Sequence, residues 1–408
     1  MSNLEAVYRS ISSMEPLMPG TVGGRISDLS VEIFKKSGEL RASLPSVVVR
    51  GQVAKLVREM NSYYSNLIEG HKTLPRDIER ALREDFSDDE DDQRNQRLSV
   101  AHVRTEEAMG ALLSRNPGTD VYGVEFICWL HREFYSHISE EDWFTTSHQG
   151  VRHPLEPGVI RDNNVDVGRH TPPDHLSVGD FLQRYGSFYS STAIPATERL
   201  VAVAAAHHRL AWIHPFGDGN GRVARLQSQA AMIQAGLDGE GLWTLSRGLA
   251  RARQAYFAGL QAADRKRESD LDGRGNLSDK ALSGFCQFFL GQTLDQLEFM
   301  IGLISPFSLV DRIEAYLRFT RGDLDAKLRE HMVRLLKALC LEGEIPRGAV
   351  SEILGLKGTA ARDVTRKALE EELVGSPSPK GVLRIAFPNK VVEFYFPQLF
   401  TDLPVDVG

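Results

Sequence analysis

Apolar residues recur at helical spacing through most of this chain, whereas the alternating runs typical of half-buried strands are few. In the segment 46–70, for example, Val53, Val57, Met60 and Tyr64 fall on one face of a predicted helix. The chain has 408 residues, of which 42% are hydrophobic and 25% charged. The sequence therefore predicts a mainly α protein of about two or three domains.

Several classes of protein are excluded by composition. No apolar run approaches the roughly 18 residues of a membrane-spanning helix, and the first residues contain neither a basic nor an apolar leader segment. The three cysteines are odd in number and far apart, which indicates free thiols rather than a disulfide framework. The net charge of −7 argues against nucleic-acid binding over the whole surface. We therefore expect a cytoplasmic protein.

The first three quarters of the chain are divided by two polar stretches. Helices are predicted at 76–83, 99–115, 119–138, 177–190, 196–213, 220–235, 246–263 and 279–303. The acidic run 84–95 is predicted to be a solvated loop, because like charges repel one another. The Gly- and Pro-rich stretch 140–178 contains two short extended pieces, 159–161 and 165–167, on either side of turn-forming residues. A small hairpin is predicted there.

The pattern changes after Pro306. Shorter helices are predicted at 309–318, 325–342, 346–354 and 358–373. Two strand-like runs follow, at Val382–Phe387 and Val391–Phe396. The last three helices and the two-stranded tail have the order of a winged helix-turn-helix. We place the boundary near 304–308 and assign residues 306–408 to a winged-helix domain.

The segment 213–226, Ile-His-Pro-Phe-Gly-Asp-Gly-Asn-Gly-Arg-Val-Ala-Arg-Leu, joins two predicted helices. The first helix ends at the His-Pro pair, and the second opens near Asn220 or Gly221. Gly217, Gly219 and Gly221 permit a tight turn and close approach of the backbone to a ligand. The start of the second helix directs unpaired N–H groups and its positive dipole end at the turn, which favours an anion.

Side chains of the same block suit phosphate chemistry. Arg222 and Arg225 share one helical face and can both hold phosphate oxygens. Asp218 is a hard oxygen ligand suited to Mg²⁺, and His214 can accept a proton near neutral pH. Each feature alone is commonly structural: a plain loop, a solvated face or a core histidine. Together, within the twelve residues 214–225, they predict a phosphoryl- or nucleotidyl-transfer site.

The block from His214 to Arg225 resembles, without a mismatch, the motif of Fic-domain proteins, His-x-Phe-x-Asp/Glu-Gly-Asn-Gly-Arg-x-x-Arg. The similarity continues upstream through Ala-Ala-His-His-Arg-Leu-Ala-Trp-Ile and covers roughly residues 40–300. It implies a Fic-type helical core with a small β-hairpin flap. The implied domains are a helical region at 1–98 with an inhibitory helix, a Fic core at 99–305, and the winged-helix domain.

The resemblance implies a protein adenylyltransferase, which moves AMP from ATP, with Mg²⁺, to a Ser, Thr or Tyr hydroxyl of a target protein. His214 is then the general base and Asp218 the metal ligand, whereas Phe216 anchors the loop in the core. The residues implied to bind the nucleotide are Gly219, Asn220, Gly221, Arg222 and Arg225. Such a centre works chiefly by alignment and charge neutralisation.

Other reactions known in the family are alternatives to AMP transfer. Doc-type kinases have Lys at the position of Gly221 and transfer the γ-phosphate, so Gly221 disfavours a kinase. Phosphocholine transfer is left open by the motif. The sequence also leaves open self-modification, a homodimer and the identity of the target.

A second motif lies upstream, where residues 65–70 read Ser-Asn-Leu-Ile-Glu-Gly. They resemble the inhibitory Ser/Thr-x-x-x-Glu-Gly/Asn motif of Fic proteins with an N-terminal inhibition helix. The implied arrangement pairs Glu69 with Arg225, which blocks the guanidinium needed for the γ-phosphate, while Ser65 positions the helix. Alternatively, Glu69 ends an ordinary helix with Gly70 as its C-cap, and both can hold. In some relatives this glutamate also positions a water that removes AMP.

Three assignments are less specific. The hairpin at 159–167 falls where the family has a flap, whose edge could pair with an extended target segment near His214. Tyr256 either borders the adenine or is an ordinary core tyrosine. Between 355 and 385 there are six basic and four acidic residues, a small excess of positive charge for a DNA-binding surface. The C-terminal module could bind DNA, bind protein or pack against the Fic domain, and we favour a protein-binding or structural role. A transcription regulator whose Fic fold senses nucleotide is the second hypothesis, and the intact His214 favours the transferase.

Overall fold

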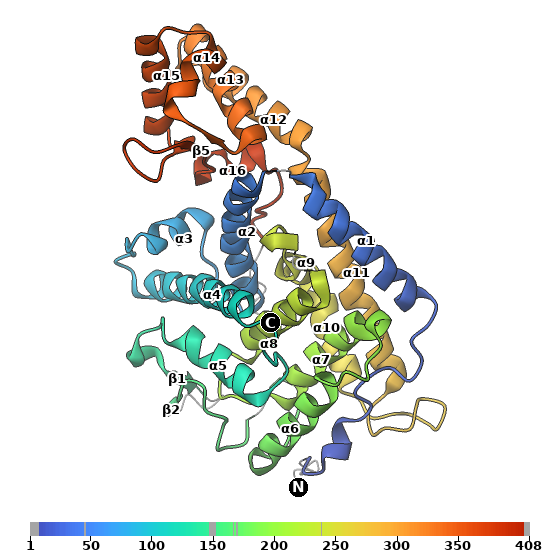
Figure 1. Cartoon of the computed structure of the whole chain (residues 1–408). Coiled ribbons are helices and arrows are strands. Elements are labelled where there is room, and N and C mark those ends of the chain that lie inside the picture. The colour runs from blue at the N-terminus through green and yellow to red at the C-terminus, as the bar shows by residue number, and fades with distance from the viewer. Residues whose placement is uncertain are drawn as a thin grey trace.

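The structure is a computed structural model that describes residues 8–44, 46–146, 152–165, 167–168, 170–237 and 239–403. The N-terminal region contains α1 (Arg25–Ser43), α2 (Val47–Ile68), α3 (Pro75–Leu82) and α4 (Glu90–Arg115). The central region contains α5 (Val124–Tyr135), β1 (Phe144–Thr146), β2 (Arg152–Pro154), α6 (Val178–Tyr189), α7 (Arg199–Ile213), α8 (Asn220–Met232), α9 (Leu245–Arg251), α10 (Arg253–Ala263) and α11 (Asp279–Ile304). The mainly α fold predicted from the sequence is confirmed (Figure 1).

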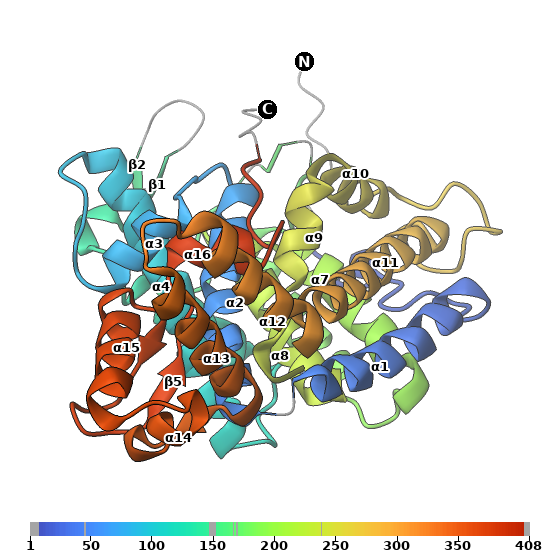
Figure 2. The same ribbon diagram turned by 90° about the horizontal axis from the view of Figure 1, so that it is seen from above.

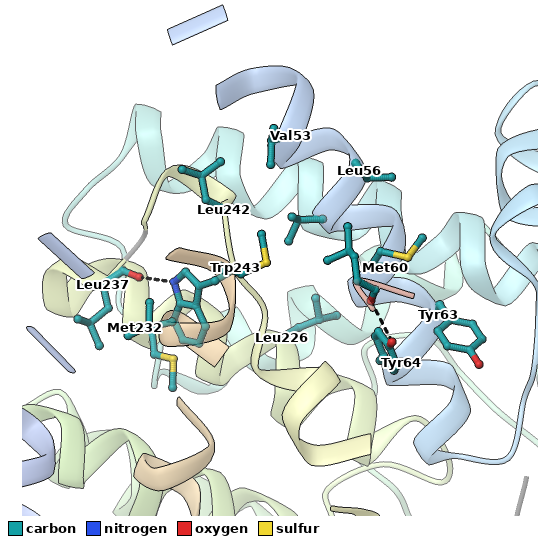
Figure 3. Packing of buried hydrophobic residues seen from close by; sticks show 14 of the residues in the cluster. Val53, Leu56, Met60, Tyr63, Tyr64, Leu226, Met232, Leu237, Leu242 and Trp243 are labelled. Carbon is teal, nitrogen blue, oxygen red and sulfur yellow. Dashed lines mark hydrogen bonds between the residues drawn. The ribbon is translucent and has the colours of Figure 1, made fainter. Parts of the chain in front are cut away.

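The helix α2 occupies the centre of the molecule. It packs against α3 and α4 on one side and against α8 and α9 on the other, whereas α1 packs along α11 (Figures 1 and 2). Val53, Leu56 and Met60 of α2 belong to the same buried cluster as Leu226 and Trp243 (Figure 3). The apolar face of α2 therefore packs it against α8, the helix that begins in the motif segment 213–226, and against α9.

The C-terminal unit lies at one end of the molecule, against α2 and α3 (Figure 1). It contains α12 (Pro306–Ala315), α13 (Ala326–Glu342), β3 (Glu344–Ile345), α14 (Val350–Leu354), α15 (Gly358–Glu370), β4 (Val374–Gly375), β5 (Leu383–Ile385) and α16 (Asn389–Tyr395). Its three antiparallel strands have the order β3-β5-β4. The winged-helix assignment and the domain boundaries stay predictions.

The prediction that the whole acidic run 84–95 is a loop is wrong, because α4 begins at Glu90. The Asp89 side chain accepts hydrogen bonds from the backbone N–H groups of Asp91 and Asp92 and so caps the helix. Glu90, Asp91 and Asp92 occupy the first turn, where the positive end of the helix dipole stabilises negative charge. The charge run is thus compatible with a helix start.

Two predicted β elements are also wrong. The hairpin is formed by β1 and β2, not by 159–167, where a single bridge joins Val167 to His170; Asp166 lies outside the described residues. The run Val391–Phe396 is not a strand but lies largely within α16. Its residues favour strands, but Val391, Val392 and Tyr395 are buried at helical spacing, so tertiary packing selects the helix.

Candidate active site

The motif forms a tight turn between α7 and α8. The first helix ends because His214 adopts a left-handed backbone conformation (φ 51°) ahead of Pro215, while its N–H still donates to the Leu210 carbonyl. Gly219, also left-handed (φ 77°), precedes the first residue of α8. The backbone is thus reversed within 214–219, and the N-terminus of α8 faces the turn.

Two residues of the motif close this turn from within. The Asn220 side chain accepts from the Phe216 N–H (2.9 Å) and donates to the Phe216 carbonyl (2.8 Å). The Phe216 ring is fully buried and stacks on the His131 ring, with centroids 4.0 Å apart. Asn220 therefore shapes the loop, and Phe216 takes the anchoring position that the sequence suggested.

The helix α5 supports the turn from the other side. The Tyr135 hydroxyl donates to Asp218 Oδ2 (2.9 Å), and the His131 Nε2 lies 3.2 Å from the Asp218 carbonyl oxygen. A Cβ atom at Gly219 would lie 3.1 Å from the Tyr135 ring, so this position requires glycine for close approach as well as for its φ. Sequence analysis missed both α5 residues, because nothing local marks them as neighbours of a loop about 80 residues away.

The His214 backbone is held by Arg161, a third residue that sequence analysis missed. The Arg161 Nε donates to the His214 carbonyl (2.8 Å), and the Arg161 N–H donates to the Pro215 carbonyl (3.0 Å). The remaining guanidinium nitrogens donate to the carbonyls of Asn163 (2.9 Å) and Pro173 (2.6 Å). Burial, then electrostatic interactions with His170 and the Arg161 guanidinium, lower the pKa of His214 to about 4. The imidazole is therefore neutral at pH 7 and can accept a proton.

Asp218 and Arg222 form the charged part of the site. The Asp218 side chain is 49% exposed, and its Oδ2 lies 3.5 Å from Arg222 Nη2. Partial desolvation opposes ionisation, but the Arg222 charge, the Gly219 N–H and the Tyr135 hydroxyl outweigh it and lower the pKa of Asp218. An ionised, accessible carboxylate of this kind fits Mg²⁺, which usually takes one or two protein carboxylates together with phosphate oxygens. The described residues contain no group of three or more His, Cys, Asp or Glu side chains able to hold a metal by themselves.

Arg222 carries buried, unsatisfied hydrogen-bond donors. Its residue is 4% exposed, and its guanidinium carbon lies 5.2 Å from the centroid of the Phe134 ring. The Nε and Nη1 atoms have no hydrogen-bond partner among the described residues. Because buried N–H groups without partners are costly, these donors indicate a place for anionic oxygen atoms next to the N-terminus of α8.

Arg225 is enclosed by the end of α2. Its Nε donates to the Ser65 hydroxyl (2.9 Å), and its Nη2 donates to the Ser65 carbonyl (2.9 Å) and to Glu69 Oε1 (2.7 Å). Burial raises the pKa of Glu69, but the charges of Arg225 and Arg222 overcome this effect and lower it, so the carboxylate is ionised. The structure thus brings together the residues of both motifs, which are more than 150 positions apart.

Gly221 makes room for this ion pair. A Cβ atom at Gly221 would lie 2.2 Å from Glu69 Oε1 and 3.1 Å from Arg225 Nη1. The Glu69 carboxylate therefore sits directly over the first turn of α8, where a phosphate group would also be favoured. Glu69 follows the last residue of α2 and Gly70 has a left-handed backbone (φ 90°), so the C-cap alternative and the contact with Arg225 hold together.

The observed hairpin lies next to the turn. A Cβ atom at Gly217 would lie 3.0 Å from Thr145 Cγ2 of β1 and 3.3 Å from Leu155 Cδ1, the residue after β2. The β1–β2 hairpin therefore borders the loop that ends in Asp218, which is the place expected of a flap. The position of the hairpin in the sequence differs from the prediction, but its place beside the site matches the expected one.

Tyr256 lies in the core rather than in an open pocket. It is 2% exposed, and its hydroxyl lies 2.8 Å from His207 Nε2, whose other ring nitrogen lies 2.8 Å from the Ser228 hydroxyl. This is the arrangement of the core-tyrosine alternative. We therefore leave Tyr256 out of the site proposed below.

Comparison with protein families matches residues 121–231 to the model described as the Fic/DOC family. This range runs from just before α5 to α8 and contains the hairpin and the motif. The chain therefore carries a Fic domain at these residues. Among its helices in the described ranges, none combines the length and the apolar character required to cross a bilayer.

Curated relatives share this segment. "Protein adenylyltransferase Fic" of Drosophila erecta is 33% identical over 113 residues, which are 28% of this chain and 20% of that protein. The protein of the same name from Drosophila melanogaster is 32% identical over 113 residues, with the same shares. The chain thus spans about a fifth of the length of the curated relatives it matches.

Solved structures resemble more of the chain. A Fic family protein from Desulfovibrio desulfuricans G20 has a TM-score of 0.54 at 17% identity, covering 91% of this chain and 99% of that one. A Fic domain containing signaling protein from Bacteroides thetaiotaomicron has a TM-score of 0.50 at 16% identity, covering 66% and 95%. The Fic-type fold predicted from the motif is thereby confirmed.

Proposed function

We propose that the chain is an autoinhibited protein adenylyltransferase, which moves AMP from ATP to a hydroxyl group of a target protein. One observation carries this proposal: His214 and the ionised carboxylate of Asp218 lie on the turn 214–219, and Asp218 is 3.5 Å from Arg222, which has unsatisfied donors in the first turn of α8. The names of the curated relatives over the same segment support it.

In the proposed reaction the hydroxyl oxygen of the target forms a bond to the α-phosphorus of ATP. The bond between that phosphorus and the oxygen bridging to the β-phosphate breaks, and pyrophosphate leaves with the bonding electrons. The hydroxyl proton passes to the ring of His214. Arg222 and the N-terminus of α8 stabilise the charge on the phosphate oxygens. Asp218 would hold Mg²⁺, which neutralises phosphate charge when bound.

The ion pair between Glu69 and Arg225 is the proposed resting state. Arg225 Nε is engaged by Ser65 and Nη2 by the Ser65 carbonyl and Glu69 Oε1 (2.7 Å), so neither nitrogen is free to hold a phosphate oxygen in this state. The carboxylate also adds negative charge above the first turn of α8, which repels a triphosphate. The role of Glu69 in removing AMP from a target is not part of this proposal.

The proposal is tested by the position of the label that reaches protein. The purified chain is incubated with Mg²⁺ and with ATP labelled either at the α- or at the γ-phosphate, alone and with a cell lysate. We expect protein-bound label from the α-labelled nucleotide only. Label from the γ-phosphate would instead indicate phosphorylation, and the absence of both with ATP bound would refute the transferase.

The acid limb of the pH profile should report on His214. Transfer should stay constant from neutral pH down to about pH 5 and fall as pH drops through the His214 pKa of about 4, where the base gains a proton. Arg161→Gln removes a nearby positive charge, so the pKa of His214 rises and the limb moves to higher pH. Arg161→Lys keeps the charge and should leave the limb in place while lowering the rate. NMR titration of the His214 ring measures its pKa directly. The same acid limb in Arg161→Gln and Arg161→Lys would contradict an effect of the Arg161 charge on His214.

DNA binding by the C-terminal unit gains no support from its side chains. On α15, Arg366 pairs with Glu370 (2.7 Å) and Lys367 with Glu371 (2.9 Å). Such pairing offsets two of the basic charges that a recognition helix would offer to phosphates. We therefore put forward no transcription-regulator function.

A further inference from the structure

The C-terminal segment Phe396–Leu403, here termed the C-terminal clamp, extends from α16 beside the second half of α2 (Figure 1). It leaves the C-terminal unit and contacts α2, α9 and the segment after α2. Phe396 and Leu399 are buried, with 0% and 1% exposure. The clamp is therefore a packed part of the fold that links the C-terminal unit to the helix carrying Ser65 and Glu69.

Tyr64 of α2 makes the central polar contact with the clamp. Its hydroxyl donates to the Leu399 carbonyl (3.0 Å) and accepts from the Thr401 N–H (2.9 Å). The neighbouring Tyr63 ring lies edge-on against the Phe400 ring, with centroids 4.8 Å apart. Two successive residues of α2 thus contact the same segment.

Further contacts hold both ends of the clamp. Buried Arg247 of α9 donates from Nη2 to the Gln398 carbonyl (2.7 Å). Lys72, three residues after Glu69, pairs with Asp402 (2.5 Å). The clamp therefore contacts the chain both before and after Glu69 and restrains the C-terminal end of α2.

Adjacent residues in the last turns of α2 contact the clamp and Arg225. Tyr64 contacts the clamp, and the next residue, Ser65, contacts Arg225 through its hydroxyl and its carbonyl. Successive helical residues point about 100° apart, so this end of α2 lies between the clamp on one face and α8 on another. A movement of α2 away from Arg225 must therefore also break or carry along the contacts with the clamp.

We infer that the C-terminal clamp holds α2 in the position in which Glu69 occupies Arg225, so that release of the clamp activates AMP transfer. The inference rests on the proposed function and gives the C-terminal unit a regulatory role: whatever displaces that unit loosens the inhibitory contact. It needs no DNA and no change at the motif itself. The proposed coupling is thermodynamic: every contact with the clamp that is lost when α2 moves away from Arg225 favours the inhibited state.

The test compares variants of the clamp with a matched phenylalanine elsewhere in the C-terminal unit. Phe400→Ala removes the ring packed on Tyr63, and Tyr64→Phe removes only the hydroxyl that binds the clamp. Phe319→Ala is the control, since Phe319 is 85% exposed. We expect transfer from α-labelled ATP, and amide hydrogen exchange over residues 60–70, to rise roughly tenfold in Phe400→Ala and about threefold in Tyr64→Phe. Phe319→Ala should match the wild type.

Combination with Glu69→Gly separates the clamp from the proposed function. If the clamp acts through Glu69, Phe400→Ala should give no further rise in transfer in the Glu69→Gly background. Unchanged transfer and exchange in both clamp variants would overturn the inference, as would a full additional rise in that background. Lack of activation by Glu69→Gly itself would refute autoinhibition instead, and the exchange data would still show whether the clamp restrains α2. Tyr64→Phe keeps the test valid should Phe400→Ala fail to fold.

Discussion

Replacing Glu69 by glycine is expected to raise the rate of AMP transfer roughly tenfold to a hundredfold. In the wild type the ionised Glu69 carboxylate lies 2.7 Å from Nη2 of Arg225, whose side chain is almost fully buried. Without the carboxylate, Arg225 is free to hold a phosphate oxygen, and the negative charge above the first turn of α8 is gone. Initial rates with α-labelled ATP and Mg²⁺ measure the effect.

Glu84→Gly is the matched control for this variant. Glu84 is exposed and has a left-handed backbone (φ 65°), so glycine is tolerated there without strain. The control should transfer AMP at the wild-type rate. Equal rates for Glu69→Gly and Glu84→Gly would show that the ion pair with Arg225 is structural rather than inhibitory.

Replacing His214 by alanine should lower the transfer rate by a factor of about 10²–10⁴, also in the Glu69→Gly background. The loss follows from removal of the neutral imidazole that accepts the hydroxyl proton, whereas Asp218 and Arg222 are untouched. Nucleotide affinity, measured by calorimetry, should therefore change only a few-fold. The expected signature is a fall in kcat with little change in KM for ATP.

His137→Ala serves as the control for the loss of a histidine, because His137 is an exposed residue just after α5. It should retain full activity. A His214→Ala variant that still transfers AMP at the wild-type rate would remove the proton acceptor from the mechanism. The pH profile would then have to be assigned to another group.

Local patterns were sufficient for much of the molecule. The helical apolar period predicted most of the central helices, and the glycines of the motif predicted the turn between α7 and α8. The errors arose where the same local sequence is compatible with two kinds of secondary structure. The acidic residues 90–92 suit both a solvated loop and a helix N-terminus, and the run from Val391 to Phe396 has strand-forming residues at positions that are also buried at helical spacing.

Local sequence was enough to predict the proposed chemistry, because His214 and Asp218 lie on a turn whose shape depends on neighbouring glycines and Asn220, and Arg222 follows in the first turn of α8. The residues that surround this turn could be identified only from the packing of the helices. Tyr135, Arg161 and Glu69 reach it from distant segments, and their approach depends on how whole helices pack rather than on residue spacing. Packing of this kind is a sum of many weak contacts spread over the core, so no short stretch of sequence records it.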